Sequence, residues 1–158
     1  MKNDKLLVRK IKDGIVIDHL HVGIGIKVLT LLGIDPNTNT VVVASGVESK
    51  KMGKKDIVKI ENLWPDENIL KLISLISPNA TVNFIKDWKI VRKQKVELPQ
   101  KVVGLVKCPN EKCVTNDEKE KKHLKTSFTL VDKKYLMCDY CEHMISLEEV
   151  TNYVRIYE

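Results

Sequence analysis

The sequence predicts an α+β chain, in which an antiparallel sheet with two helices on one face is followed by a small all-β body. Three observations support this expectation. Apolar patterns of strand and helix type follow one another over residues 6–93 in the order β, β, α, β, β, α, β, β. A polar segment containing Pro99 comes next, at 94–101. All four cysteines of the chain lie beyond that segment.

The first two strands are expected at residues 6–11 and 14–19, where β-branched and other apolar residues dominate. Lys12 and Asp13 stand between them, directly before Gly14. Because the separation is so short, the sequence predicts that the two strands pair with each other as a hairpin.

The first helix is predicted over residues 22–33, because large apolar side chains recur there at helical spacing. Gly33 stands where a helix commonly ends, since glycine adopts the left-handed conformation without steric cost. The side chains expected to face the core are Val22, Ile26, Leu29 and Leu32.

Residues 35–40 are rich in turn-forming residues and separate this helix from the next two strands. These strands are expected at 41–45 and 56–62, where β-branched residues dominate again. The basic segment 46–55 between them contains two glycines, and we interpret it as a loop.

The second helix is predicted over residues 67–76 and ends before Pro78, which cannot continue a helix. Two more strands are expected at 80–85 and 88–93. The order contains a β-α-β-β-α-β core with an extra edge strand, as in ferredoxin-like domains, and both helices should pack on one face. The apolar stripe of the second helix consists of Ile69, Leu72, Ile73 and Ile76.

The polar segment with Pro99 is interpreted as a joint between two domains, expected at residues 1–98 and 99–158. The second of these is short. A β domain of that size rarely buries enough apolar surface to be stable alone, so it needs a covalent or metal crosslink.

The cysteines occur as two pairs, C-P-N-E-K-C and C-D-Y-C. Each pair can form a tight knuckle that directs two thiolates at one ion, and zinc accepts four thiolates tetrahedrally. A complete set of protein ligands leaves no position for water, so we expect one structural Zn²⁺ per chain in a zinc-ribbon or rubredoxin-like domain. Iron is the alternative metal. His123 and His143 are expected at the surface or behind the ligands. The ligands are Cys108, Cys113, Cys138 and Cys141.

The bulk composition restricts the class of protein. Aromatic residues make up only 5% of the 158 residues, so the core must be aliphatic. No apolar run has the roughly 20 residues needed to span a bilayer, and the N-terminus is too charged for a secretory signal. We therefore expect a cytoplasmic protein without a membrane partner. The net charge of +6 permits binding to polyanions without choosing among them.

Common catalytic motifs are absent from the sequence. The segment 46–55 does not have the glycine spacing of a phosphate loop, and residues 23–28 lack the third glycine of a dinucleotide fingerprint. Neither G-x-S-x-G nor H-E-x-x-H occurs. On this basis the chain is not expected to be an enzyme.

Asp18 and His19 form an unusual end to the apolar strand that starts at Gly14. Adjacent strand residues point to opposite faces, so these two cannot form a catalytic dyad with each other. Three roles remain open: a capped strand end, a pair of ligand-binding groups, or a base and an orienting group that each use other partners. Candidate partners are Lys59, Asn83 and Lys93.

Several stretches resemble one known family. They are G-I-V-I-D-H, M-G-K-K-D-I-V-K-I-E-N, A-T-V-N, C-P-N-x-x-C and C-D-Y-C. In this order and spacing they resemble the regulatory chain of aspartate carbamoyltransferase over nearly the whole length. The second stretch is the most specific, because it precedes a four-cysteine knuckle pair.

The resemblance implies a non-catalytic subunit in pyrimidine biosynthesis. Its first domain would be allosteric, binding CTP, ATP and, as a further candidate, UTP, and would pair with its own copy in a regulatory dimer. Its second domain would hold zinc and dock on a separate catalytic chain. Nucleic acid is not among the partners that the family implies.

The resemblance also implies site residues by position. Asp18 and His19 would lie at the base and ribose end of the effector pocket, Lys59 would contact the ribose, and Lys93 would bind the triphosphate. Lys5 belongs to an N-terminal segment that can join a nucleotide site. The remaining pocket positions are Ile11, Val16, Asn83, Ile85, Trp88 and Ile90.

Three positions depart from the family pattern. His21 replaces a proline, Trp88 stands where tyrosine is common, and Ile15 replaces a frequent threonine. These changes bear on effector preference more than on the fold. The basic charge and the cysteine pairs also leave an alternative, a nucleic-acid-binding zinc-ribbon protein, whose affinity should fall steeply with salt. An enzyme that uses Asp18 and His19 is the third hypothesis, and it lacks a third catalytic group.

Overall fold

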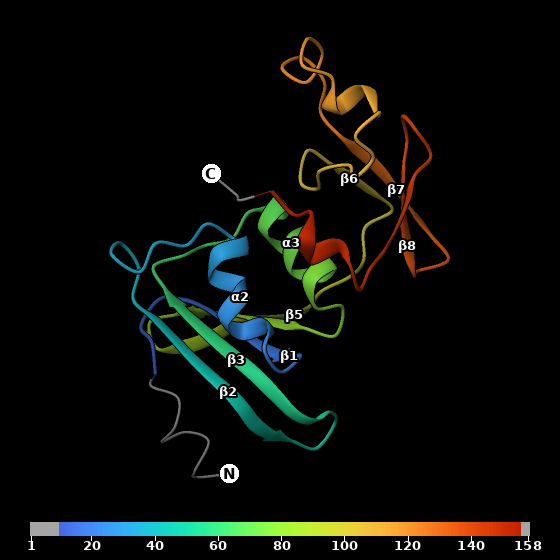
Figure 1. Cartoon of the computed structure of the whole chain (residues 1–158). Helices are drawn as coiled ribbons and strands as arrows, with labels where there is room; N and C mark the ends of the chain where they lie inside the picture. The colour runs from blue at the N-terminus through green and yellow to red at the C-terminus, as the bar shows by residue number, and fades with distance from the viewer. Residues whose placement is uncertain (1–9, 156–158) are drawn as a thin grey trace.

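The computed structural model describes residues 10–155, which form two bodies that each contain one antiparallel sheet. Figure 1 shows two helices on one side of the first sheet and a second, helix-poor body beside them. The strands of the first sheet lie in the order β2 (Val41–Ser49), β3 (Gly53–Glu61), β1 (Gly14–Leu20), β4 (Thr81–Lys86) and β5 (Lys89–Lys95).

The connectivity of the first sheet is the ferredoxin-like pattern that the sequence predicts. Helix α2 (Ile24–Leu31) joins β1 to β2, and helix α3 (Glu67–Ile76) joins β3 to β4. Every pair of neighbouring strands is antiparallel. Strand β5 is the extra edge strand, so the α+β prediction for this body is confirmed.

The predicted hairpin between residues 6–11 and 14–19 is wrong where it can be examined. Residues 6–9 lie outside the described part of the chain, and Lys10 and Ile11 belong to no strand. The physical reason is that β1 is a central strand. Strands β3 and β4 already pair with its two edges, so no edge of β1 is left for residues 6–11.

The predicted loop at 46–55 is also wrong. Strands β2 and β3 continue through it as a long hairpin, and only residues 50–52 form the turn. A change of register between Ala44 and Val47 lies beside Gly46, whose φ of 72° is available to glycine at little cost. This irregularity lets the strand continue past the glycine that suggested a loop.

The prediction for helix α2 is correct for only half of the side chains expected to face the core. Leu32 is buried and Leu29 packs partly buried against the core, but Val22, which precedes the helix, is 54% exposed and Ile26 is 66% exposed. Gly25 and Val28 are buried in their place. The N-terminus of the helix decides which face turns inward, because the buried Asp56 carboxylate accepts hydrogen bonds from Gly23 N at 2.9 Å and from Gly25 N at 3.0 Å.

Helix α3 agrees with the prediction. Asp66 caps its N-terminus by accepting a hydrogen bond from Ile69 N at 2.9 Å. The helix ends at Ile76, two residues before Pro78. The whole predicted stripe is buried, namely Ile69, Leu72, Ile73 and Ile76.

The second body is the small all-β domain that the sequence predicts. Its sheet has the order β6 (Lys101–Val103), β7 (Ser127–Val131), β8 (Tyr135–Cys138) and β9 (Met144–Ser146). Two short 3₁₀ helices accompany the sheet, η1 (Val114–Asn116) and η2 (Val150–Asn152). In the sequence, the first sheet ends before residue 98 and the second sheet begins after it. The exact domain limits, 1–98 and 99–158, stay a prediction.

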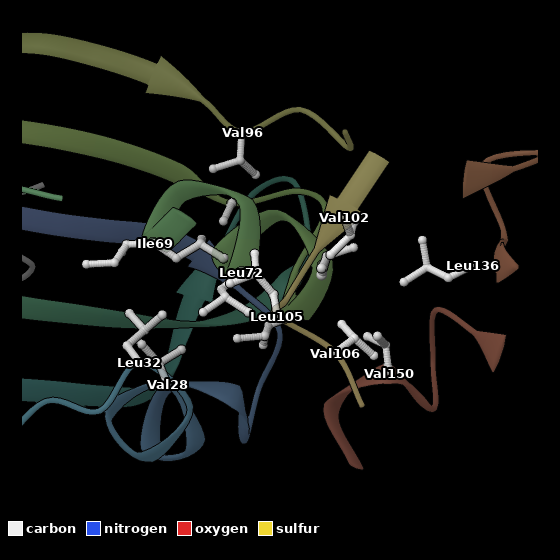
Figure 2. Close-up of a cluster of buried hydrophobic side chains, with 14 of the residues drawn as sticks. Val28, Leu32, Ile69, Leu72, Val96, Val102, Leu105, Val106, Leu136 and Val150 are labelled. Atoms are coloured by element: carbon white, nitrogen blue, oxygen red, sulfur yellow. The ribbon is translucent and has the colours of Figure 1, made fainter. Parts of the chain in front are cut away.

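One apolar core runs through both bodies. Leu105 from the second body lies beside Leu72 of α3, and Val106 and Val150 lie next to each other in the same core, as Figure 2 shows. Helix η2 contacts α3 directly. The second body therefore packs on the helical layer, and no described helix or strand covers the opposite face of the first sheet. No helix in the described part of the chain is long and apolar enough to cross a membrane.

Candidate functional site

A cavity of about 400 Å³ lies on the face of the first sheet that the helices do not cover. Alternation along the strands explains its lining, because Ile15 and Ile17 of β1 point into the core and Val16 and Asp18 point the other way. The cavity is lined by Lys10, Ile11, Val16, Asp18, Ile57, Lys59, Asn83, Ile85, Trp88 and Ile90.

Strand register orders these residues from an apolar end to a polar end. Gly14, Ile85 and Ile90 lie in one row across β1, β4 and β5. Two residues further along β1, another row runs from Lys59 through Val16 and Asn83 to Lys93. The register therefore places a lysine at each end of the second row, whereas the first row has Ile85 and Ile90 on β4 and β5 and Glu61 at its β3 end.

Trp88 stands at the apolar end, in a tight turn between β4 and β5. Asp87 and Trp88 both have positive φ, 49° and 69°, a conformation that is unusual for a bulky residue. Two contacts hold the turn: Trp88 N donates to Lys12 O at 2.9 Å, and Asp87 N donates to Asp13 Oδ1 at 3.0 Å. The indole is nevertheless 60% exposed, so the turn presents a flat apolar surface at the cavity mouth.

The polar end is built around a change of register in β1 between Ile17 and Leu20. His19 has a φ of 59° there, and its backbone N donates to Asp18 Oδ1 at 2.6 Å. The same carboxylate oxygen lies 3.0 Å from Lys55 Nζ. Asp18 is therefore held by the chain itself from two directions.

The electrostatic surroundings of His19 are strongly cationic. Burial lowers the pKa of His19. Asp18 raises the pKa, and Lys55, Lys51 and Lys93 lower it further. Since three lysines act on one imidazole, this end of the cavity is suited to a ligand group with several negative charges.

Two polar side chains, Asn83 and Lys59, lie in the middle of the cavity. Asn83 Oδ1 is buried and has no hydrogen-bond partner in the described part of the chain. Lys59 lies in the same row, and its pKa is lowered by burial and by the nearby Lys10. A buried polar group without a partner costs free energy, and a ligand can remove this cost.

Most of the nucleotide residues that the sequence predicts come together in this cavity. His19 and Lys93 do not line the cavity but lie at its polar end. Lys93 lowers the pKa of His19, and the strand register places Lys93 opposite Asn83. Lys5 is outside the described residues. Sequence reasoning missed Lys55 and Ile57, although a strand continued back from Lys59 would have placed them on the same face. It also missed Lys10 and Lys51.

The second site is the four-cysteine cluster, whose sulfur atoms all lie within 4.8 Å of one another. Cys108 Sγ is 3.6 Å from Cys141 Sγ, and Cys113 Sγ is 3.8 Å from Cys138 Sγ. Four sulfurs at about 2.3 Å from one zinc ion would lie about 3.8 Å apart at the corners of a tetrahedron. The donor set and the spacing therefore fit one tetrahedral zinc ion.

Backbone turns shape both knuckles. Cys113 N donates to Asn110 O at 2.9 Å, and Cys138 N donates to His143 O at 2.8 Å. Burial raises the pKa values of Cys108 and Cys138. Thiols with raised pKa values hold their protons, so zinc must displace those protons when it binds. The affinity for zinc should therefore fall as the pH falls.

Asp139 fastens the second knuckle to the sheet. Its carboxylate accepts hydrogen bonds from Lys101 Nζ at 2.8 Å and from Thr129 Oγ1 at 2.6 Å, and Ser127 Oγ also donates to it. Burial raises the pKa of Asp139, but these three donors together lower it to about 2. His143 and His123 are exposed, in agreement with a surface position, and they do not belong to the cysteine cluster.

The fold and the two sites define a class of protein: an α+β domain with a cavity on its open sheet face, joined to a small β domain with a four-cysteine cluster. Residues 6–97 match the family model described as the allosteric domain of the aspartate carbamoyltransferase regulatory chain. Residues 100–151 match the model for the metal binding domain of the same chain.

Individual relatives carry the same description. The chain is 44% identical over 150 residues to the aspartate carbamoyltransferase regulatory chain of Saccharolobus islandicus, covering 94% of each protein. It is also 44% identical to that of Staphylothermus marinus, covering 96% of this chain and 93% of the relative. The identity is again 44% to that of Thermococcus gammatolerans, with coverages of 92% and 96%. The chain belongs to the family of aspartate carbamoyltransferase regulatory chains.

Proposed function

We propose that the cavity of the first domain binds nucleoside triphosphates, with CTP and ATP competing for it and UTP as a further candidate. The observation that carries this proposal is the gradient along the cavity. Trp88, Ile85 and Ile90 form an apolar end, and His19 lies at the other end among three lysines. A nucleotide has the same gradient, from an aromatic base to a polyanion.

The gradient assigns an orientation to the ligand. The base lies against Trp88 and Ile90, the ribose lies near Lys59 and Asn83, and the triphosphate reaches Lys93 and Lys55. This orientation puts His19 beside the triphosphate, whereas the family resemblance implied the base and ribose end for that residue. An indole offers a large flat surface for stacking a base. Lysine ammonium groups bind phosphate oxygens through charge-assisted hydrogen bonds. The wide separation of the two ends favours a triphosphate over a nucleoside.

We further propose that the chain catalyses no reaction and regulates a separate catalytic chain of aspartate carbamoyltransferase in cytoplasmic pyrimidine biosynthesis. CTP would then be a feedback inhibitor. The nucleotide shifts the assembly only if its affinities for two quaternary states differ, because equal binding to both changes nothing. ATP at the same cavity would oppose CTP by competition and by its own preference between the states.

The metal domain is the proposed docking surface for that catalytic chain. Several of its exposed side chains are apolar: Val114 and Tyr140 each adjoin a cysteine in the sequence, and Met144 follows shortly after Cys141. Rigid knuckles hold such side chains in a fixed arrangement, which reduces the entropy that docking costs. Bound zinc supplies this rigidity and takes no part in a reaction.

We also propose that the first domain pairs with its own copy through the β2 edge of its sheet. The two edges of the sheet differ in chemistry. The opposite edge, β5, carries Lys89, Arg92 and Lys93, and charged edge strands resist pairing. Strand β2 begins with Val41, Val42, Val43 and Ala44. The neighbouring helix α2 exposes Ile26.

Calorimetric titration of the zinc-loaded chain with CTP, repeated in the presence of ATP, tests the nucleotide proposal. Saturable binding should be displaced by ATP and should be lost or weakened in Lys93→Ala and His19→Ala. Lys89→Ala is the matched control, because it removes an exposed lysine from the same strand outside the cavity lining. A folded chain that binds neither nucleotide, alone or assembled with a catalytic chain, would overturn the proposal.

A further inference from the structure

The Cys113 sulfur is the one cysteine sulfur that has a side-chain hydroxyl as a partner in the described part of the chain. Backbone N–H groups donate to the sulfurs of Cys108, Cys138 and Cys141, and the Asn110 side chain also donates to Cys141. Cys113 Sγ instead lies 3.1 Å from the side-chain oxygen of Thr115, two residues later. Both residues are almost completely buried, at 2% and 1% exposed.

Local structure fixes the position of the Thr115 hydroxyl. Thr115 is the middle residue of η1, and this short helix is closed by a hydrogen bond from Asn116 N to Cys113 O at 2.9 Å. The side-chain amide of Asn116 donates to Cys108 O and to Asn110 O, both at 2.8 Å. The first knuckle and η1 are therefore one rigid unit, and the hydroxyl is held next to the sulfur.

Metal binding decides the direction of this hydrogen bond. A thiol and a hydroxyl can each donate, but a zinc-bound thiolate has no proton. The hydroxyl of Thr115 must then be the donor. One zinc ion with four thiolates carries a formal charge of about −2, and this charge is buried, so each donor to sulfur stabilises the complex.

We propose that the Thr115 hydroxyl is the positioning group that stabilises the zinc-bound Cys113 thiolate and slows its release from the metal. It does for Cys113 what the backbone N–H groups do for the other three ligands. Groups behind the metal ligands commonly change metal affinity by about 10-fold to 100-fold. We expect an effect near the lower limit, because one hydrogen bond among several is involved.

The test uses the full chain loaded with zinc or with cobalt. Thr115→Val keeps the shape of the side chain and removes the donor, and Thr115→Ser keeps the donor. With zinc, the transfer rate of the metal to a chromophoric chelator should rise about 10-fold in Thr115→Val and should stay near wild type in Thr115→Ser. With cobalt, the sulfur-to-metal charge-transfer band should move to longer wavelength only in Thr115→Val, because the thiolate becomes more electron-rich.

Thr126 provides a matched control in the same domain. It is fully buried, and its hydroxyl donates to Val106 O at 2.6 Å without contacting a cysteine in the described structure. Thr126→Val should lower the thermal stability and leave the cobalt band unchanged. An identical band and transfer rate in Thr115→Val and wild type would overturn the proposal, and so would an equal band shift in Thr126→Val. If Thr115→Val does not fold, Thr115→Ala and Thr115→Ser are compared by the same criteria.

Discussion

Lys55 Nζ lies 3.0 Å from Asp18 Oδ1 at the polar end of the cavity. Both side chains are largely shielded from solvent, at 16% and 23% exposed. A cation that faces the proposed triphosphate site is thus neutralised by a neighbouring carboxylate in this structure. A nucleotide that binds here competes with Asp18 for Lys55, so the pair sets part of the affinity for the triphosphate.

Lys55→Ala is expected to weaken CTP binding about 10-fold, because it removes one charge-assisted hydrogen bond worth about 1.5 kcal/mol. Cytidine has no phosphate and should bind almost as it does to wild type. Calorimetric titration with both ligands separates the two effects. Lys54→Ala is the control, since Lys54 is exposed on the same strand, whereas Lys55 pairs with Asp18 and acts on His19. Equal losses for cytidine and CTP would exclude this role for Lys55.

Trp88 combines backbone strain with an exposed ring. Replacing it with alanine removes the indole but keeps a Cβ atom in the left-handed region, whereas glycine also relieves the strain. Trp88→Gly should therefore be more stable than Trp88→Ala by about 1 kcal/mol. Both variants should lose nucleotide affinity to a similar extent. Urea unfolding measures the first effect and titration the second; nucleotide binding at wild-type strength in both variants would remove Trp88 from the site.

His19 makes stability and binding depend on pH in opposite directions. Burial and the three lysines hold its pKa below 6.5, so the unfolded chain binds a proton more readily than the folded chain. Stability should therefore fall as pH drops below 6.5 towards the folded pKa. A bound triphosphate favours the protonated imidazole, so CTP affinity should rise over the same range.

Urea unfolding and CTP titration between about pH 5 and pH 8 measure both slopes. His19→Asn is the appropriate comparison, because asparagine tolerates the positive φ of this position. Both pH slopes should become smaller in this variant. Wild-type slopes in His19→Asn would assign the titration to another group.

Removal of zinc is expected to loosen the second domain and release the catalytic chain. The four cysteines lose the metal ion that joins them, and apolar burial in so small a domain does not compensate for that loss. Sedimentation of the assembled complex before and after chelation measures the release, and zinc addition should reverse it. A chelated chain that retains its catalytic partner with unchanged affinity would contradict the proposed docking surface.

The proposed pairing through β2 predicts different effects of two exposed apolar positions. Ile26→Lys should weaken the dimer at least about 10-fold, because an unpaired ammonium group would be buried at the interface. Val91→Lys, on the opposite edge of the sheet, should leave the dimer intact; Val91 is 56% exposed in the single chain. Sedimentation equilibrium measures both. The reverse result would move the interface to β5.

Local sequence signals were sufficient for several elements. The stripe of α3 is regular, and Pro78 limits the length of the helix. The cysteine pairs predicted one metal cluster, and the four sulfurs do lie together. The interactions that form α3 lie within a few residues of one another, so the apolar periodicity predicts the helix. Two closely spaced cysteine pairs are typical of a metal site, so their spacing predicts the cluster.

Other features were decided by the tertiary structure. The face of α2 is set by Asp56, which is 31 residues away from Gly25, and no local pattern reports that contact. The hairpin predicted at the N-terminus fails because distant strands occupy both edges of β1.

The sequence by itself determined the family, the metal ligands and most of the residues that line the cavity. Only the tertiary structure decided that Lys55 and Lys51 join His19 and Lys93, and that Thr115 lies against Cys113. The physical reason is that strand pairing and the packing of short turns bring these groups together across the chain. In the sequence each of these groups is an ordinary lysine or threonine, and only the fold supplies its neighbour.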